Sequence, residues 1–226
     1  MGFQSKFLGP ALVALVLASC GAEAVRERPA VADPAAEEAR RGVEAAEVLA
    51  ALEATFYIHW GAVEGTAEYA RLDGRHQGVL RGIVDANGER ALMALRVLRR
   101  LSPGERFTDD AVAMVYAGAL DRERNFVRWG VFGPRGFIPA VYGQELLRLG
   151  KGAAPALRGL LESRRRAPVF GDSEGERANR RQGDRVCDYA WVFLALIFDR
   201  PLAYSEDPRD RDPQIRALDL WLDRRK

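Results

Sequence analysis

The sequence predicts a mainly α-helical fold, all-α apart from one irregular segment rich in glycine and aromatic residues around 122–141. Elsewhere apolar residues recur at spacings of three and four, which is the pattern of amphipathic helices. The stretch 189–198 carries no charge and is apolar almost all round, so we expect it to be a central, buried helix. At ten residues it is too short to cross a bilayer.

The composition fits a globular chain and excludes some classes of function. Its 226 residues are 48% hydrophobic and 29% charged, which is enough to bury a core. With 34 basic and 32 acidic residues the formal net charge is +2, which offers no electrostatic case for nucleic-acid binding. We therefore expect no nucleic-acid partner, and the sequence leaves the oligomeric state open.

The first nineteen residues have the features of an export signal. Lys6 supplies a positive charge, and an uncharged, mostly apolar run follows over 7–19. The run ends in Leu17-Ala18-Ser19-Cys20-Gly21, which resembles the lipobox of bacterial lipoproteins. The resemblance implies that Cys20 becomes the lipidated first residue of the mature protein and attaches it to a membrane. The alternative is an ordinary secretory signal that is cleaved beyond Cys20.

This resemblance divides the chain into three parts. We expect residues 1–19 to be a signal peptide, 20–39 to be a flexible tether, and 40–226 to be a single α-helical domain. The protein would be exported and lipid-anchored to the bacterial cell envelope. Glycine, not aspartate, follows Cys20, so the resemblance implies the periplasmic face of the outer membrane if the host is Gram-negative.

Local signals place the first helices. An apolar helical stripe starts near Ala35 and continues through 45–60, after which glycines over 61–82 predict short or broken helix. Residues 85–88 predict a turn, and a second helix is expected over about 89–101, with leucines facing inward and arginines outward.

The middle and the end of the chain carry further signals. Thr108 is a good N-cap for a helix that runs to about Leu120. In the irregular segment, 127–132 predicts a short extended stretch and 133–136 a turn. A last amphipathic helix is expected to hold the apolar residues of 215–222.

Two segments resemble HEAT-like helical repeats. Leu149–Leu161 has the pattern Leu-Gly-x-x-Ala-x-Pro-Ala-Leu-x-x-Leu-Leu, and Arg185–Ile197 has the pattern Arg-Val-x-Asp-x-Ala-x-x-x-Leu-x-x-Ile. The resemblance covers about 144–226 and implies short antiparallel helix pairs that form a fragment of an α-solenoid. The chain departs from the family in having about two units with a long loop between them, whereas stacked repeats usually need three or more. The N-terminal helices would then complete the stack.

No catalytic, cofactor or metal motif is present in the sequence. His59 and His76 are the only histidines, and neither zinc-binding nor haem-binding spacings occur. Cys187 lies in the most apolar helix, where we expect a buried, unreactive thiol. The acidic residues of 206–212 could hold Ca²⁺, but we expect a helix N-terminus with Asp210 or Asp212 as its cap. We therefore expect no catalytic residue, metal or cofactor.

Two groups of residues are candidates for binding a partner. Arg164, Arg165 and Arg166 open a basic loop that could dock an acidic partner, unless nearby carboxylates simply neutralise it. The other group consists of Trp129, Phe132 and Phe137 in the glycine-aromatic segment, because conformationally special loops often carry function. These rings could instead be core residues that join two helical halves.

The sequence thus predicts a membrane-anchored lipoprotein whose helical domain is an interaction or scaffold module of the cell envelope. Its partners would be the membrane, through the lipid on Cys20, and an envelope protein. The alternative is a periplasmic hydrolase that uses carboxylates such as Glu145 or Asp188. For that role Asp188 should have a raised pKa in an open pocket and should not form a salt bridge to Arg185.

Overall fold

The computed structural model describes residues 34–57, 67–104, 106–124, 126–133, 136–167, 169, 177 and 182–225. The predicted signal peptide, Cys20, His59 and most of the predicted tether lie outside the described residues. The described part is mainly helical, as predicted, with one two-stranded antiparallel sheet.

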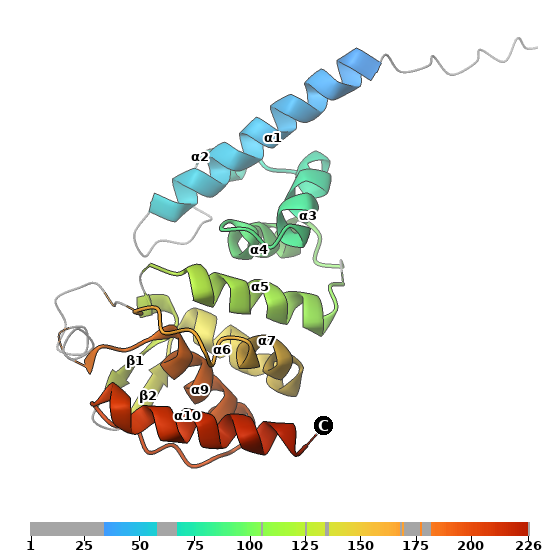
Figure 1. The fold of residues 1–226 in the computed structure, drawn as a ribbon. Coiled ribbons are helices and arrows are strands. Elements are labelled where there is room, and N and C mark those ends of the chain that lie inside the picture. The colour runs from blue at the N-terminus through green and yellow to red at the C-terminus, as the bar shows by residue number, and fades with distance from the viewer. Residues whose placement is uncertain are drawn as a thin grey trace, which may run out of the picture.

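The described elements follow one another from one end of the molecule to the other (Figure 1). In chain order they are α1 (Pro34–Tyr57), α2 (Ala67–Ala70), η2 (Gly74–His76), α3 (Gln77–Asp85), α4 (Ala91–Leu101), α5 (Asp109–Arg122), η3 (Phe126–Arg128), β1 (Gly130–Gly133), β2 (Gly136–Pro139), α6 (Val141–Arg148), η4 (Gly150–Ala153), α7 (Ala154–Arg158), α9 (Val186–Ile197) and α10 (Pro208–Asp223). None of the described helices is long and apolar enough to cross a membrane.

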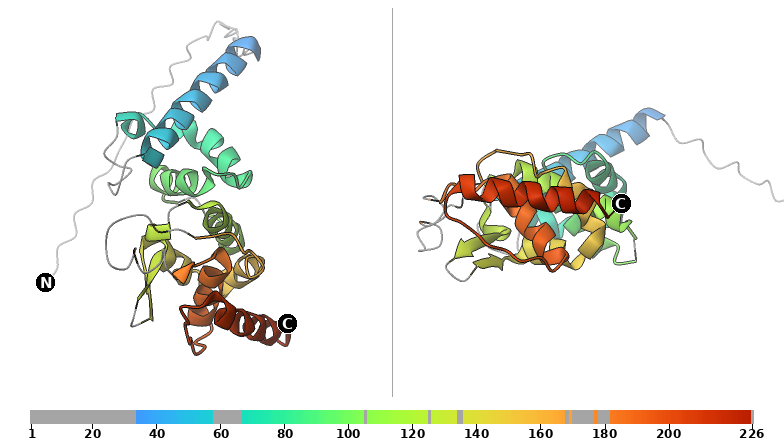
Figure 2. Two further views of the ribbon diagram at one scale, coloured as in Figure 1. Left: turned by 60° about the vertical axis from the view of Figure 1, so that its left-hand side comes forward. Right: turned by 60° about the horizontal axis from the view of Figure 1, so that its bottom comes forward.

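Helix α1 begins at Pro34, close to the start of the predicted stripe, so the last residues of the predicted tether are helical. Its C-terminal half packs against α2, η2 and α3, with Val48 and Leu52 buried. Its N-terminal turns project from the rest of the domain (Figures 1 and 2).

Helices α4 and α5 follow the predicted pattern. In α4, Leu95 and Leu98 are fully buried, whereas Arg99 is exposed. Thr108 caps α5 as expected, because its side-chain oxygen accepts the backbone N–H of Ala111 at 3.2 Å. The local sequence therefore determines where these helices lie and which face they bury.

The segment predicted to be irregular forms the short 3₁₀ helix η3 and a hairpin of β1 and β2. In the hairpin Val131 pairs with Ile138 and Phe132 with Phe137. The extended stretch predicted over 127–132 is confirmed from Gly130 onward. Of the turn predicted over 133–136, Gly133 and Gly136 pair with each other at the end of the hairpin, and residues 134 and 135 lie outside the described residues.

Helix α9 is the central helix of the C-terminal half, as its apolar sequence predicted. All of its residues from Val186 to Ala195 are buried, and α6, α7 and α10 pack against it. Helix α10 lies across the end of the molecule farthest from α1 (Figures 1 and 2).

The cap of α10 differs from the prediction. Asp207 is the N-cap, and its carboxylate accepts the backbone N–H of Arg209 at 2.8 Å. The expectation that Asp210 or Asp212 caps the helix is wrong, since both lie within it. Pro208, directly after Asp207, provides the favoured first-turn residue earlier than Pro213 does, so the helix starts there.

Gly143 of α6 provides a test of the packing between the helices and the hairpin. A Cβ at this position would lie 2.2 Å from the carbonyl oxygen of Trp129 and 3.0 Å from the ring of Phe193. We expect Gly143→Ala to lower the free energy of unfolding by about 1–3 kcal/mol, because backbone must shift to admit the methyl group. Urea denaturation followed by circular dichroism measures the change.

Gly82→Ala in α3 is the matched control. A Cβ there would meet nothing within 4 Å. Alanine costs less entropy than glycine in a helix, so this variant should gain up to about 1 kcal/mol. Equal changes of the same sign in both variants would contradict the close approach at Gly143.

Candidate functional site

The rings that were candidates for partner binding lie inside the molecule. Trp129 and Phe132 are fully buried, and Phe137 is partly buried with its ring centroid 5.0 Å from that of Phe132. The prediction of a binding surface is therefore corrected for Trp129 and Phe132, whose side chains cannot reach a partner. The physical reason is that the hairpin closes over α9, so that its large rings pack against Tyr189 and Phe193.

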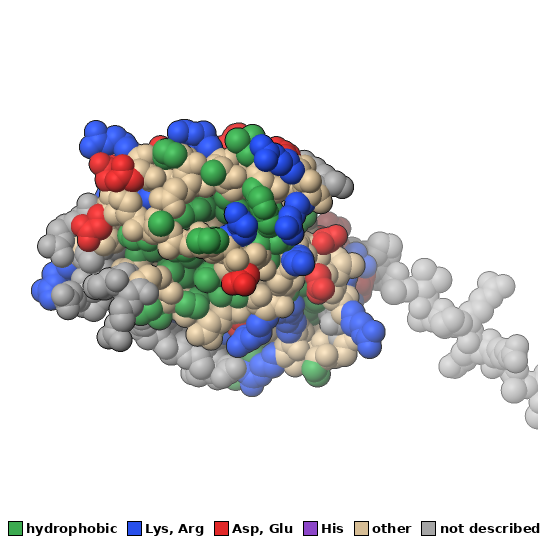
Figure 3. Space-filling model, turned by 90° about the horizontal axis from the view of Figure 1, so that it is seen from below, with side chains coloured by type: hydrophobic (Ala, Val, Ile, Leu, Met, Phe, Trp, Pro, Cys, Tyr) green, Lys and Arg blue, Asp and Glu red, His purple; other side chains and the backbone are tan. Residues whose placement is uncertain are grey.

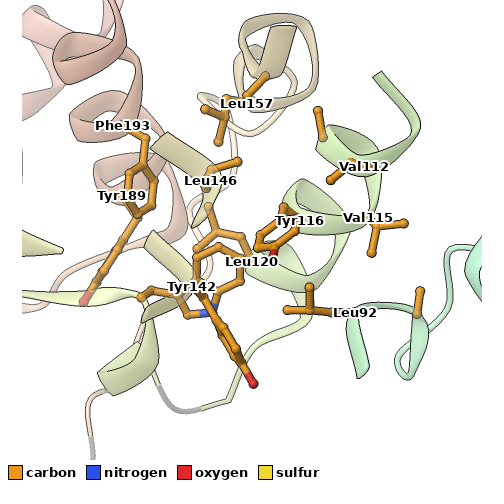
Figure 4. Close-up of a cluster of buried hydrophobic side chains, with 14 of the residues drawn as sticks. Leu92, Val112, Val115, Tyr116, Leu120, Tyr142, Leu146, Leu157, Tyr189 and Phe193 are labelled. Atoms are coloured by element: carbon orange, nitrogen blue, oxygen red, sulfur yellow. The ribbon is translucent and has the colours of Figure 1, made fainter. Parts of the chain in front are cut away.

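Trp129 instead positions two tyrosines at the edge of the core. Its ring packs edge-on against Tyr116 of α5 and Tyr142 of α6, with centroid distances of 6.2 Å and 5.7 Å. Figure 4 shows both tyrosines in the buried cluster, with the hydroxyl of Tyr142 pointing away from it. The aromatic core thus fixes the position of the Tyr142 phenol, although this residue is itself only 3% exposed.

Two guanidinium groups converge on Tyr142. Arg128 of η3 donates from Nη1 to the phenol oxygen at 2.9 Å, and its Cζ lies 5.7 Å from the ring centroid. Arg96 of α4 has its Cζ 5.2 Å from the centroid of the same ring. The phenol donates to the sulfur of Met93 at 3.7 Å. We call Arg96, Arg128 and Tyr142 the arginine–tyrosine cluster.

A carboxylate lies beside this cluster. Tyr116 donates its hydroxyl to Glu145, which holds the carboxylate in place. Burial lowers the pKa of Arg96, but the charges of Tyr142 and Glu145 outweigh burial and raise that pKa overall. Burial raises the pKa of Tyr116, and the hydrogen bond to Glu145 raises it further, so this phenol is neutral at pH 7.

The sequence did not single out Arg96 or Arg128 as site residues. They lie on different elements, α4 and η3, and no motif or spacing links them. Only the packing of Trp129 on Tyr142 brings the two arginines to one phenol. Glu145, named as a candidate carboxylate, does lie at this place.

A second polar cluster lies at the N-terminus of α9. Asp188 is fully buried and forms salt bridges with Arg185 at 2.9 Å and with Arg211 at 3.3 Å. Arg211 is also fully buried and pairs with Asp184. Tyr204 donates its hydroxyl to Asp184 as well. Burial raises the pKa of Asp184, although these hydrogen bonds oppose the shift.

This buried ion-pair network joins segments that are distant in the sequence. Arg185 also pairs with Asp212 of α10 at 2.8 Å. Beside it, the backbone N–H of Val186 donates to the carbonyl of Arg165 at 2.9 Å. The salt bridge of Asp188 to Arg185 is the arrangement expected of a structural residue and not of a hydrolytic base.

The three arginines of the predicted basic loop have different environments. Arg165 binds the C-terminal end of α5, donating to the carbonyls of Leu120 at 3.1 Å and Glu123 at 2.7 Å. Such a cation satisfies helix-end carbonyls and complements the helix dipole. Arg166 is exposed, and its guanidinium forms no hydrogen bond within the described part of the chain. Of Arg165 and Arg166, only Arg166 has a guanidinium group that is available to a partner.

Cys187 and His76 are both buried and make contacts inside the domain. Cys187 is buried, with Nη1 of Arg164 at 3.0 Å from its sulfur, and burial raises the pKa of the thiol. His76 is buried too, with Nε2 at 2.9 Å from Glu47 and Nδ1 accepting the backbone N–H of Asp73 at 3.0 Å. Neither side chain is therefore placed as a nucleophile or a base.

An apolar face lies over α9 and α10. Figure 3 shows hydrophobic side chains gathered there with basic side chains beside them. Leu196 and Leu220 are 45% and 59% exposed. Trp221 lies against both Arg200 and Arg225, whose Cζ atoms are 4.8 Å and 4.2 Å from its ring. Exposed leucine beside tryptophan and arginine is typical of protein contact surfaces.

No family model, curated protein or solved structure matches this chain. Within the described ranges, no group of histidine, cysteine, aspartate and glutamate is arranged to hold a metal ion. Asp188 and Glu145, the carboxylates of the hydrolase alternative, are held by Arg185 and Tyr116 respectively. Both carboxylates therefore have partners within the domain.

The buried ion-pair network can be tested at Arg211. We expect Arg211→Met to lower the free energy of unfolding by about 3–5 kcal/mol, because Asp184 and Asp188 would lose a buried counter-charge. Arg209→Met is the control in the same helix, since Arg209 is exposed and pairs with Asp207 at the surface. The control should leave the urea midpoint unchanged. Equal losses in the two variants would show that burial of the network does not stabilise the fold.

Proposed function

We propose that this protein is an exported lipoprotein, held on the bacterial cell envelope by a lipid on Cys20, whose helical domain binds an envelope protein. The sequence Leu17–Gly21, after a charged start and an apolar run, is the single observation that carries the proposal. Acyl chains on Cys20 would contribute about 0.8 kcal/mol per buried CH₂, enough for stable attachment with more than one chain. In a Gram-negative host the domain would face the periplasm from the outer membrane.

The described domain supports an interaction role. Its apolar face over α9 and α10 is exposed, whereas its candidate carboxylates have internal partners. We also propose that the C-terminal part, about 144–226, is related to HEAT-like repeats. In support, Pro155 lies in the first turn of α7, as it does in the second helix of such repeats, and α7 packs against α9. A surface of this kind binds by shape and needs no catalytic group.

The lipid anchor is tested by metabolic labelling in a bacterial host. The wild-type chain should incorporate radiolabelled palmitate and sediment with membranes, and Cys20→Ala should lose both properties. Cys187→Ala is the matched control, because it removes the other cysteine of the chain and should keep the label. Unlabelled wild-type protein, or a labelled Cys20→Ala variant, would refute the anchor.

The partner-binding role is tested at the exposed end of the basic loop. Arg165 is unsuitable for substitution because it caps α5. Arg166→Glu leaves that cap in place and should reduce recovery of envelope proteins crosslinked to the anchored chain. Arg71→Glu, another exposed arginine, is the control and should not change recovery. Recovery that is the same for both variants and the wild type would remove the basic loop from the proposal.

A further inference from the structure

The arginine–tyrosine cluster holds more positive charge than its neighbours neutralise. Elsewhere in the domain arginines lie against carboxylates, as Arg185 does with Asp188 and Asp212. Arg96 and Arg128 form no salt bridge with any carboxylate of the described residues, and both lie against the phenol of Tyr142 instead. A phenol is a weaker counterpart for two cations than a carboxylate is.

The wider surroundings leave a surplus of positive charge. Glu145 acts on Arg96, and Arg99, one turn further along α4, acts on the Tyr116 phenol that is bonded to Glu145. Glu145 thus offsets part of the charge of Arg96, and Arg128 has no salt bridge to a carboxylate of the described residues, so positive charge is left over at this pair. A phosphate monoester carries about −1.5 to −2 charges at pH 7, which is opposite in sign to this surplus.

The donors are held in place before any ligand arrives. Arg128 directly precedes the fully buried Trp129, and Tyr142 packs on the same ring at 5.7 Å. Arg96 lies between the buried residues Leu95 and Val97 in α4. Both arginines are only partly buried, so part of each residue is open to solvent. Preorganised guanidinium forks are well suited to the oxygens of a phosphate.

We propose that Arg96 and Arg128 bind a phosphate group at the ring of Tyr142, which both guanidinium groups approach. The ligand is inorganic phosphate or a phosphate monoester, since both present the same oxygens. This site does not depend on the lipid anchor.

The test is isothermal titration of the full-length chain in detergent with sodium phosphate at pH 7.5 and constant ionic strength. We expect saturable binding of one phosphate per chain. Arg96→Gln and Arg128→Gln should each weaken it about tenfold or more, because each removes a charge-assisted contact. Glycerol 3-phosphate in a second arm distinguishes the sources: tighter binding than inorganic phosphate assigns the site to an ester, and weaker binding assigns it to the free ion.

Arg100→Gln is the matched control. Arg100 lies in the same helix with its Cζ 4.7 Å from the ring of Tyr69, so it has an aromatic neighbour as Arg96 does but lies on a different tyrosine. Its affinity for phosphate should equal that of the wild type. If Arg128→Gln fails to fold, Arg128→Lys keeps the charge without the planar fork and should weaken binding severalfold. Absence of saturable binding to the wild type, equal binding of acetate, or an equal loss in Arg100→Gln would overturn the proposal.

Discussion

Helix α9 is apolar almost all round, and the elements around it cover its residues from Val186 to Ala195. Helices α6, α7 and α10 pack on it, and the hairpin places Phe132 against Tyr189. The first turn of this helix also carries Asp188 into the interior, where a carboxylate is tolerated only with counter-charges. Arg185 and Arg211 supply them, and Arg211 belongs to α10. Covering α9 therefore determines both the hydrophobic core and the position of the last helix.

The glycine-aromatic segment connects the buried core to the partly exposed Arg128. Its rings are buried, so the segment does not itself present a binding surface. The segment holds Trp129 between α5, α6 and α9, and thereby places the partly buried Arg128 beside the buried Tyr142. A rigid aromatic support of this kind lowers the cost of keeping two like charges together, because neither side chain has to be ordered again when a ligand binds.

The near-neutral composition conceals an uneven distribution of charge. Arg185 and Arg211 form salt bridges within the buried network, and Arg165 donates hydrogen bonds to carbonyl groups at the end of α5. Arginines of the arginine–tyrosine cluster and of the face over α9 and α10 have aromatic rings as neighbours instead of carboxylates. Net charge is therefore a poor guide to what this domain binds, and the pairing of each arginine is the informative quantity.

The sequence by itself determined the local features of this protein. Helical class, the Thr108 cap, the inward leucines of α4 and the burial of α9 with Cys187 all follow from periodicity and capping within a few residues. The lipobox resemblance at Cys20 is likewise local and remains a prediction. Only the tertiary structure decided which arginines and aromatic rings stay exposed, which carboxylates are paired, and that Arg96 and Arg128 lie against the same tyrosine. Those outcomes depend on contacts between residues far apart in the chain, and such contacts leave no trace in sequence spacing.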